Sequence, residues 1–165
     1  MGIILVRVDS RLIHGQILEA WIPHTGADAL MVVDDGVAAD LLRRTVMEMA
    51  VPSSISVSFE TVRDAVDQYK HNKFENLKTI LLFSKLEDAV SAFKDGLRFE
   101  SLNLGNMHYC DGKVQVCANI CLDSDDLARI TYMEEMGIAI DSRSVPGEKK
   151  VDLSKLAFLK KRFMY

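Results

Sequence analysis

The amino-acid sequence predicts an α/β protein with an open, mostly parallel twisted sheet and helices on both faces. Two observations predict this class. Short apolar runs recur along the 165 residues, and stretches with a helical period separate them. Strand and helix therefore alternate, and this order requires right-handed crossovers that place helices on both sides of a parallel sheet. The length fits one domain covering residues 1–165.

Five apolar runs are the predicted strands of this sheet. Each is short and lies between segments of different character. They cover residues 3–8, 29–33, 55–59, 79–83 and 101–104. The segments at 37–46 and 62–69 place apolar side chains every three or four positions, as amphipathic helices do.

A different order is predicted for the last third of the chain. The Asp111-Gly112 pair is a turn signal between two extended pieces, so a hairpin is expected after Gly105. The remaining predicted elements are a helix capped by residues 124–126 and ended by Gly137, a short strand at 138–140, and a C-terminal helix that opens at Asp152.

The composition excludes several function classes. The net charge is −4, which provides no basic surface for nucleic acid or for anionic lipid. No apolar run approaches the roughly 20 residues that span a bilayer, and the N-terminus lacks the pattern of a signal peptide. We therefore expect a cytoplasmic protein without membrane insertion and without a nucleic-acid partner.

No cofactor or metal is expected. Neither of the glycine-rich nucleotide-binding motifs occurs in the chain. The histidines and cysteines lack the spacing of metal ligands. The three cysteines are Cys110, Cys117 and Cys121, an odd number without a Cys-x-x-Cys pair, so we expect reduced core residues.

The loop after the first strand carries the main functional signal. In open parallel sheets, ligands bind at the carboxyl ends of strands, where loops lead into helices. The Asp9-Ser10-Arg11 segment lies at such an end, followed by His14, Gly15 and Gln16. A helix start attracts an anion, and an arginine holds two phosphoryl oxygens with its planar fork of donors. The segment therefore predicts a phosphate site.

Each residue of this loop has an expected role. Imidazole has an unprotonated ring nitrogen near neutral pH, so His14 is the candidate nucleophile, with general base as a second possibility. Asp9 orients His14 or tethers Arg11, and spacing alone does not distinguish the two roles. Gly15 allows close backbone approach to an anion, Gln16 adds a neutral donor, and backbone amides near both complete the cradle. The alternative is an exposed ion pair with an ordinary loop histidine.

Other strand ends contribute further candidates. Ser84 and the 103–106 loop lie where they can add donors to the same phosphate site, as Ser10 of the first loop also can, although Ser84 also fits a helix cap. Asp34 and Asp35 fit a cap for the helix beginning near Val37, in preference to the magnesium-binding acids of a response-regulator receiver. Trp21 is expected in the core, close enough to brace the loop.

The segment at 7–16, with Trp21 after it, closely resembles the start of IIB components from the mannose/fructose/sorbose family of the bacterial sugar phosphotransferase system. The likeness continues through residues 32–40, 81–84 and 103–109, and so covers nearly the whole chain. Two positions depart from the common pattern: Ser10 stands where an acid is frequent, and Asn106 where a second glycine is frequent.

The resemblance implies a phosphotransferase. The histidine matching His14 accepts a phosphoryl group on Nδ1 from a phosphohistidine of a separate IIA protein, then passes it to a sugar brought by the membrane components IIC and IID. The arginine matching Arg11 holds the phosphoryl oxygens. Two alternatives stay open: a regulatory module that is phosphorylated without sugar transport, and a structural protein without phosphoryl chemistry.

Overall fold

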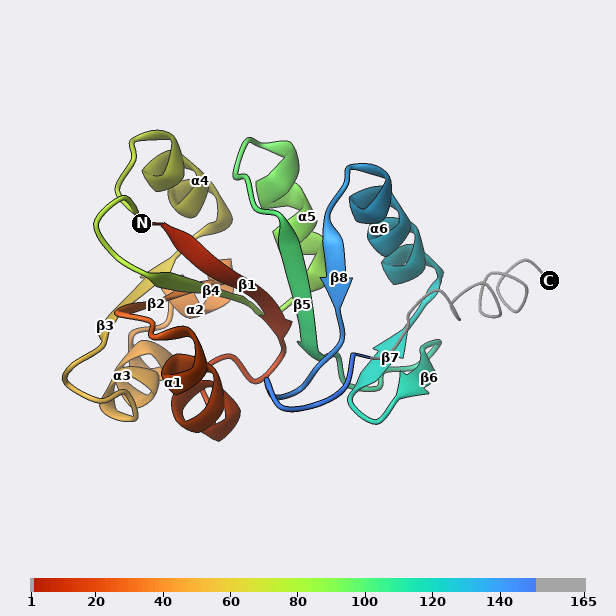
Figure 1. Cartoon of the computed structure of the whole chain (residues 1–165), viewed down its shortest axis with the longest axis horizontal. Helices are drawn as coiled ribbons and strands as arrows, with labels where there is room; N and C mark the ends of the chain where they lie inside the picture. The colour runs from red at the N-terminus through yellow and green to blue at the C-terminus, as the bar shows by residue number, and fades with distance from the viewer. Residues whose placement is uncertain (1, 151–165) are drawn as a thin grey trace.

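The computed structural model describes residues 2–150 and contains a six-stranded parallel sheet (Figure 1). Its strand order is β3-β2-β4-β1-β5-β8, and every neighbouring pair is parallel. The six strands are β1 (Ile3–Asp9), β2 (Ala29–Val33), β3 (Ser56–Glu60), β4 (Thr79–Phe83), β5 (Ser101–Asn106) and β8 (Ala139–Asp141). The predicted class and all five principal strands are confirmed.

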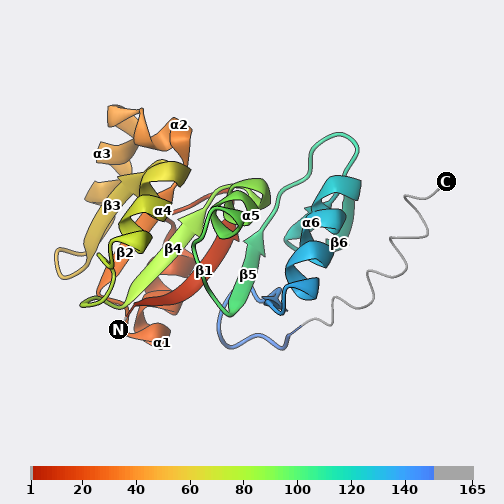
Figure 2. The same cartoon turned by 90° about the horizontal axis from the view of Figure 1, so that it is seen from above.

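Helices cover both faces of the sheet. One layer comprises α4 (Val62–Lys70), α5 (Leu86–Lys94) and α6 (Ser124–Glu135), which lie over the strands in Figure 2. The opposite layer comprises the π-helix η1 (Gln16–Trp21), its continuation α1 (Ile22–Thr25) and α3 (Leu41–Met49). The short helix α2 (Asp35–Ala38) joins β2 to α3.

Alternation along the strands divides the core in two. Val6 and Val8 belong to the core cluster under α4, α5 and α6, whereas Leu5 belongs to the cluster under η1 and α3. Successive side chains of a strand point to opposite faces, so Arg7 and Asp9 share the face of Leu5. The first strand therefore presents two charged residues to the layer that follows it in the chain.

Several details differ from the sequence predictions. The predicted helix at 37–46 is two helices, because Asp40 caps α3 separately by accepting a hydrogen bond from the Arg43 backbone N–H (3.0 Å). The cap of α6 is Asp123, not residues 124–126, and forms a capping box with Asp126. The expected hairpin exists as β6 (Val114–Cys117) and β7 (Ile120–Leu122). The turn that connects these two strands is at residues 118–119, so the Asp111-Gly112 turn lies before the hairpin and does not connect its strands.

Another difference concerns the cysteines. All three are free thiols, and Cys121 is buried and Cys117 half-buried as expected. Cys110 is exposed, so its assignment to the core was wrong. The short strand predicted at 138–140 is β8, shifted by one residue. The helix predicted to open at Asp152 lies outside the described residues.

Candidate functional site

A tight turn at the carboxyl end of β1 brings the His14 segment back over the strand. Leu12 adopts a left-handed backbone (φ 56°), and its N–H donates to the Asp9 carbonyl (2.9 Å). This conformation is unfavourable for a branched side chain and persists where the surroundings impose it. Here the Leu12 side chain is buried in the core cluster under η1, which anchors the turn.

The helix after the turn begins at the functional loop. The backbone N–H groups of Ile17 and Leu18 donate to the His14 carbonyl (2.9 and 3.1 Å). The amides of Gly15 and Gln16 therefore lie at the start of the helix, before its first hydrogen bond, where the backbone carries partial positive charge. The sequence predicts an ordinary helix here. The structure instead has a π-helix here. π-helices are rare in proteins, and those that do occur are often found at functional sites.

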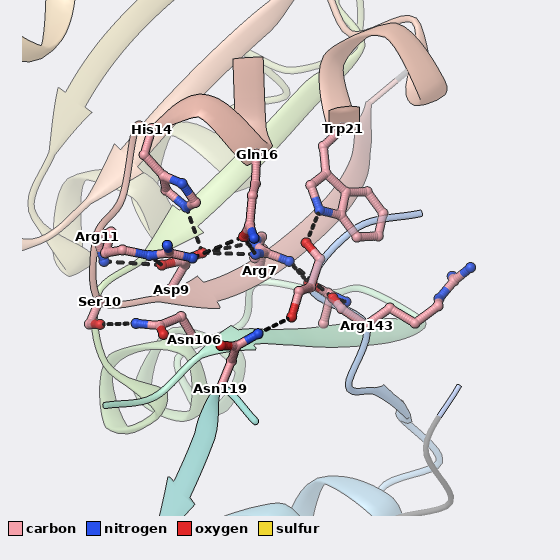
Figure 3. Close-up of polar contacts among 12 residues, drawn as sticks. Arg7, Asp9, Ser10, Arg11, His14, Gln16, Trp21, Asn106, Asn119 and Arg143 are labelled. Carbon is pink, nitrogen blue, oxygen red and sulfur yellow. Dashed lines mark hydrogen bonds and ion pairs between the residues drawn. The ribbon is translucent and has the colours of Figure 1, made fainter. Parts of the chain in front are cut away.

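Asp9 is the centre of the site (Figure 3). Its carboxylate is fully buried and accepts hydrogen bonds from Arg7 Nη2 (2.8 Å) and from the Arg11 backbone N–H (3.1 Å). His14 Nε2 lies 2.8 Å from the same carboxylate. Asp9 therefore orients His14 and tethers Arg11 at once, so the two roles considered from the sequence are combined. The pairing assigns the imidazole proton to Nε2 and leaves the Nδ1 lone pair available.

The Asp9 carboxyl group is held ionised. Burial alone would raise its pKa, but the hydrogen bond with His14, the charge of Arg7 and the Arg11 backbone N–H together lower the pKa below its ordinary value of 3.8. An ionised carboxylate beside Nε2 can balance a positive charge that develops on the imidazole ring when Nδ1 forms a new bond, which is what a nucleophilic histidine requires.

Arg7 is a site residue that the sequence analysis did not single out. Its side chain is completely buried, and it also donates from Nη1 to the Arg143 carbonyl (3.2 Å). Burial lowers the pKa of the guanidinium, while the charge of Asp9 opposes that shift. Gly105 on the neighbouring strand β5 makes room for it, because a Cβ there would lie 1.8 Å from Arg7 Cζ. A buried charge two residues before Asp9, on the same strand face, was the available signal.

Gln16 and Arg11 close the outer side of the network. The Gln16 side-chain carbonyl accepts from Arg11 Nη2 (2.9 Å) and, more weakly, from Arg7 Nη2 (3.4 Å). Arg11 remains 45% exposed, so its guanidinium is accessible to a bound anion. Gly15 is exposed, and a Cβ at that position would meet nothing within 4 Å. The space over the start of the helix is open.

Trp21 braces the site from behind. It is buried, its Nε1 donates to the Ser144 carbonyl (2.9 Å), and its ring packs against the Arg7 guanidinium at 5.5 Å. This confirms its expected placement. The segment after β8 thus supports Arg7 and Trp21 through backbone carbonyls, which no side-chain pattern in the sequence reveals. Arg143 itself is anchored by Asp141 (2.8 Å).

Ser10 and Ser84 lie outside the Asp9 network. The Ser10 hydroxyl accepts from Asn106 Nδ2 (2.6 Å) and lies 2.8 Å from His108 Nδ1. Ser84 donates to the Asp34 carboxylate. Both serines line a separate cavity of about 320 Å³ between the strand ends and the start of α5. Neither serine is hydrogen-bonded to His14, Asp9 or Arg11. Their expected role as hydrogen-bond donors to a bound phosphate therefore stays a prediction.

Asp34 is occupied structurally. Its carboxylate accepts from the Val37 backbone N–H (2.8 Å) and caps α2, which confirms the capping prediction. Burial would raise its pKa, but the hydrogen bonds from Ser84 and Val37 lower it below 3.8.

Among residues 2–150, no group of three or more histidine, cysteine, aspartate or glutamate side chains is arranged to hold a metal ion. None of the helices described is long and apolar enough to cross a membrane.

Comparisons with known proteins place the chain in a family. The family profile described as "PTS system sorbose subfamily IIB component" matches residues 3–165. A sorbose-specific EIIB component of Lacticaseibacillus casei is 34% identical over 153 residues, 93% of each chain. An N-acetylgalactosamine-specific enzyme IIB component 2 of Escherichia coli is also 34% identical, over 94% of this chain and 98% of its own.

A solved structure agrees with these sequence matches. The IIBSor domain of the sorbose permease from Klebsiella pneumoniae superposes with a TM-score of 0.89 at 28% identity, covering 96% of this chain and 98% of that one. The fold is that of phosphotransferase-system IIB components, which take part in phosphoryl transfer during sugar uptake. The chain belongs to the sorbose subfamily of IIB components.

Proposed function

We propose that residues 1–165 act as one cytoplasmic IIB domain that carries a phosphoryl group on His14. In the first step, the Nδ1 lone pair attacks the phosphorus of a phosphohistidine on a separate IIA protein. The new N–P bond forms as the old one breaks, and its electron pair returns to the donor imidazole. In the second step, a sugar hydroxyl brought by the membrane components IIC and IID takes the phosphoryl group, and Nδ1 recovers its lone pair as the hydroxyl proton is released.

The orientation of His14 is the observation that carries this proposal. Nε2 is held by Asp9 at 2.8 Å, so the free nitrogen of the ring is Nδ1. The imidazole becomes positively charged when Nδ1 bonds to phosphorus, and the ionised Asp9 balances that charge across the ring. Phosphoryl transfer needs positioning and charge stabilisation more than covalent chemistry from the protein, and this geometry supplies both.

Arg11 and the start of η1 are the proposed phosphoryl-oxygen ligands. The exposed Arg11 guanidinium is held near His14 by Asp9 Oδ1 (3.4 Å) and Gln16, while Gly15 leaves the helix start open. A charge-assisted hydrogen bond from such a group contributes about 1.5–3 kcal/mol. Because Arg11 already has two protein acceptors, it releases the phosphoryl group without leaving its own charge unpaired.

The test is phosphate incorporation. Wild-type protein and His14→Ala are incubated with phosphoenolpyruvate, enzyme I, the histidine phosphocarrier and a cognate IIA protein, with Gly147→Ala as a surface control. We expect an acid-labile, alkali-stable phosphoryl group on the wild type and the control, and at least about 1,000-fold less on His14→Ala. Equal labelling of the His14 variant, or no labelling of the wild type when IIA is charged, would contradict the proposal.

A further inference from the structure

Helix α3 exposes a continuous apolar stripe. Leu42, Val46 and Met49 recur at intervals of four and three residues, so they lie on one side of the helix, with Leu41 next to them. Leu42 is 74% exposed, Val46 61%, Met49 82% and Leu41 72%. We call these four residues the α3 stripe.

The inward side of the same helix is the less apolar one. No residue of α3 is fully buried; Arg44 and Met47 are half-buried. The Arg44 guanidinium packs over the Phe59 ring at 5.8 Å and donates to the Ala38 carbonyl (3.4 Å). The helix therefore packs Arg44 and Met47 against the sheet and leaves four other apolar residues outside, so the stripe does not serve the core described here.

Other exposed apolar side chains do not form such a cluster. Half of the large apolar side chains exposed within residues 2–150 belong to this one short helix, and the rest come from four different parts of the chain: Ile4, Leu77, Tyr109 and Met136. Single exposed apolar residues are ordinary, whereas a contiguous group on one element indicates an interaction surface.

The helix that carries the stripe belongs to the same layer as the His14 loop. Helix α3 belongs to the same layer as η1 and α1 (Figure 1), and Met47 joins the core cluster that contains Ile17 and Trp21. Only β4 lies between β1, which leads into the His14 loop, and β2, which leads into α2 and α3. Neighbouring strands are about 4.8 Å apart, so the ends of β1 and β2 are separated by about 10 Å across the sheet.

A protein that delivers a phosphoryl group to His14 must directly contact the surface formed by the carboxyl ends of the strands. A stable interface covers about 800 Å² on each partner, which corresponds to a patch roughly 30 Å across if it is round. A patch of that size centred on His14 extends past the end of β2, the strand that leads through α2 into the Leu41 end of the stripe. A phosphoryl donor bound over His14 would therefore extend onto the stripe, so this donor is the partner that the stripe fits.

We propose that the α3 stripe is the docking surface for the phosphohistidine-bearing donor protein. This inference rests on the proposed function and specifies which surface recognises the donor. Buried apolar anchors dominate the stability of protein interfaces, while the charged groups around His14 align the reacting atoms. The stripe then contributes to the affinity for the donor, while Asp9 and Arg11 support the chemistry at Nδ1.

The test compares the double variant Leu42→Ser/Val46→Ser with Met136→Ser, which removes an exposed apolar side chain at the end of α6. Initial rates of phosphoryl transfer are measured against the concentration of the phosphorylated IIA protein that labels the wild type. We expect the KM for IIA to rise at least about tenfold in the double variant, with kcat within about twofold. Met136→Ser should match the wild type.

Two further measurements separate the possible failures. Phosphorylation by phosphoramidate, a small donor that needs no docking, should proceed equally in all three proteins. A double variant with unchanged KM overturns the docking surface, and if sedimentation shows that it has lost a wild-type dimer, the stripe belongs to a second copy of this chain. A wild type that accepts phosphate from neither donor overturns the proposed function and the docking surface with it.

Discussion

Asp9 and Ser10 are adjacent in the chain, yet they serve two different regions of the molecule. The Asp9 carboxylate is buried among Arg7, Arg11 and His14 on the η1 side of the sheet. The Ser10 hydroxyl bonds to Asn106 from β5 and lines the neighbouring cavity. Sequence proximity to the histidine therefore does not decide which side chains act with it.

The two regions also differ in how they are held. On the Asp9 side, opposite charges meet at the fully buried Asp9 and Arg7, and Arg7 fills the space left by Gly105. On the Ser10 side, the serine hydroxyl makes a neutral hydrogen bond with Asn106 at the edge of a cavity. A network of buried charges is costly to disturb, because removing one partner leaves another charge unpaired. Substitutions on the Asp9 side should therefore have much larger effects.

Gly105→Ala should have the largest effect on stability. The added Cβ would lie 1.8 to 2.3 Å from three atoms of the Arg7 guanidinium, which has no space to move in the packed site. Overpacking and loss of the buried ion pair together should lower the free energy of unfolding by about 3 kcal/mol or more. Urea denaturation measures this change. Gly147→Ala is the matched control, because a Cβ there meets nothing within 4 Å; equal stability of the two variants would contradict the account of Arg7.

Asp9→Asn should have the largest effect on transfer among variants that keep the side chain's shape. The amide lacks the charge that balances the imidazolium, and it permits the wrong imidazole tautomer. We expect transfer from IIA to slow by about 100-fold or more. Rapid-quench measurement of phosphorylation at saturating IIA reports this rate. A variant that retains wild-type speed would remove Asp9 from the mechanism.

Arg11→Ala should slow transfer by about 10- to 100-fold, since it removes a charge-assisted hydrogen bond of roughly 1.5–3 kcal/mol to the phosphoryl group. Its effect on unfolding should stay below about 1 kcal/mol, because the guanidinium is 45% exposed. The same rate assay and a thermal melt give both values. Arg63→Ala on α4, in the opposite layer, is a control for the loss of one surface arginine.

The acid dependence of stability should sharpen the contrast. The folded-state pKa of Asp9 lies below 3.8, so its contribution is fully present above that pH and is lost as the pH falls through the folded pKa. Wild-type stability should therefore decline below about pH 3.8, and Asp9→Asn should decline less steeply. Unfolding free energies from pH 6 to pH 2.5 test this. Parallel curves for the two proteins would show that Asp9 titrates alike in the folded and unfolded chains.

Ser10→Ala and Ser84→Ala should have the smallest effects on transfer. Both hydroxyls are bonded within the neighbouring region and neither touches the His14 network. We expect each variant to keep its transfer rate within about threefold of wild type, because each loses a hydrogen bond that lies outside the His14 network. A loss comparable to that of Arg11→Ala would place these serines among the phosphoryl ligands after all.

Sequence reasoning indicated the His14 loop and the bracing Trp21, but not Arg7 or Gly105. Apolar runs and helical periods predict the strands and helices because burial alternates with period two or 3.6. The identities of Asp9, Arg11 and His14 follow from phosphate chemistry at a strand end. Arg7 and Gly105 become related only when β5 pairs with β1, a contact between residues 98 positions apart.

The remaining features depend on backbone geometry. The left-handed Leu12 and the π-helical start of η1 have no composition signal, since leucine and glutamine occur in ordinary helices. The reversal of the hairpin after β6 was misplaced because a strong Asp-Gly turn signal lies just before the first strand. Local turn signals identify a turn without identifying which strands it connects.

The most direct test of the central claim is the position of phosphate on the His14 ring. Protein labelled with ¹⁵N in histidine is phosphorylated through IIA and studied by imidazole proton–nitrogen correlation spectra. The account predicts phosphorus on Nδ1, with Nε2 still protonated and hydrogen-bonded to Asp9, and a change in that Nε2–H signal in Asp9→Asn. Phosphorus on Nε2, or on a residue other than His14, would contradict it.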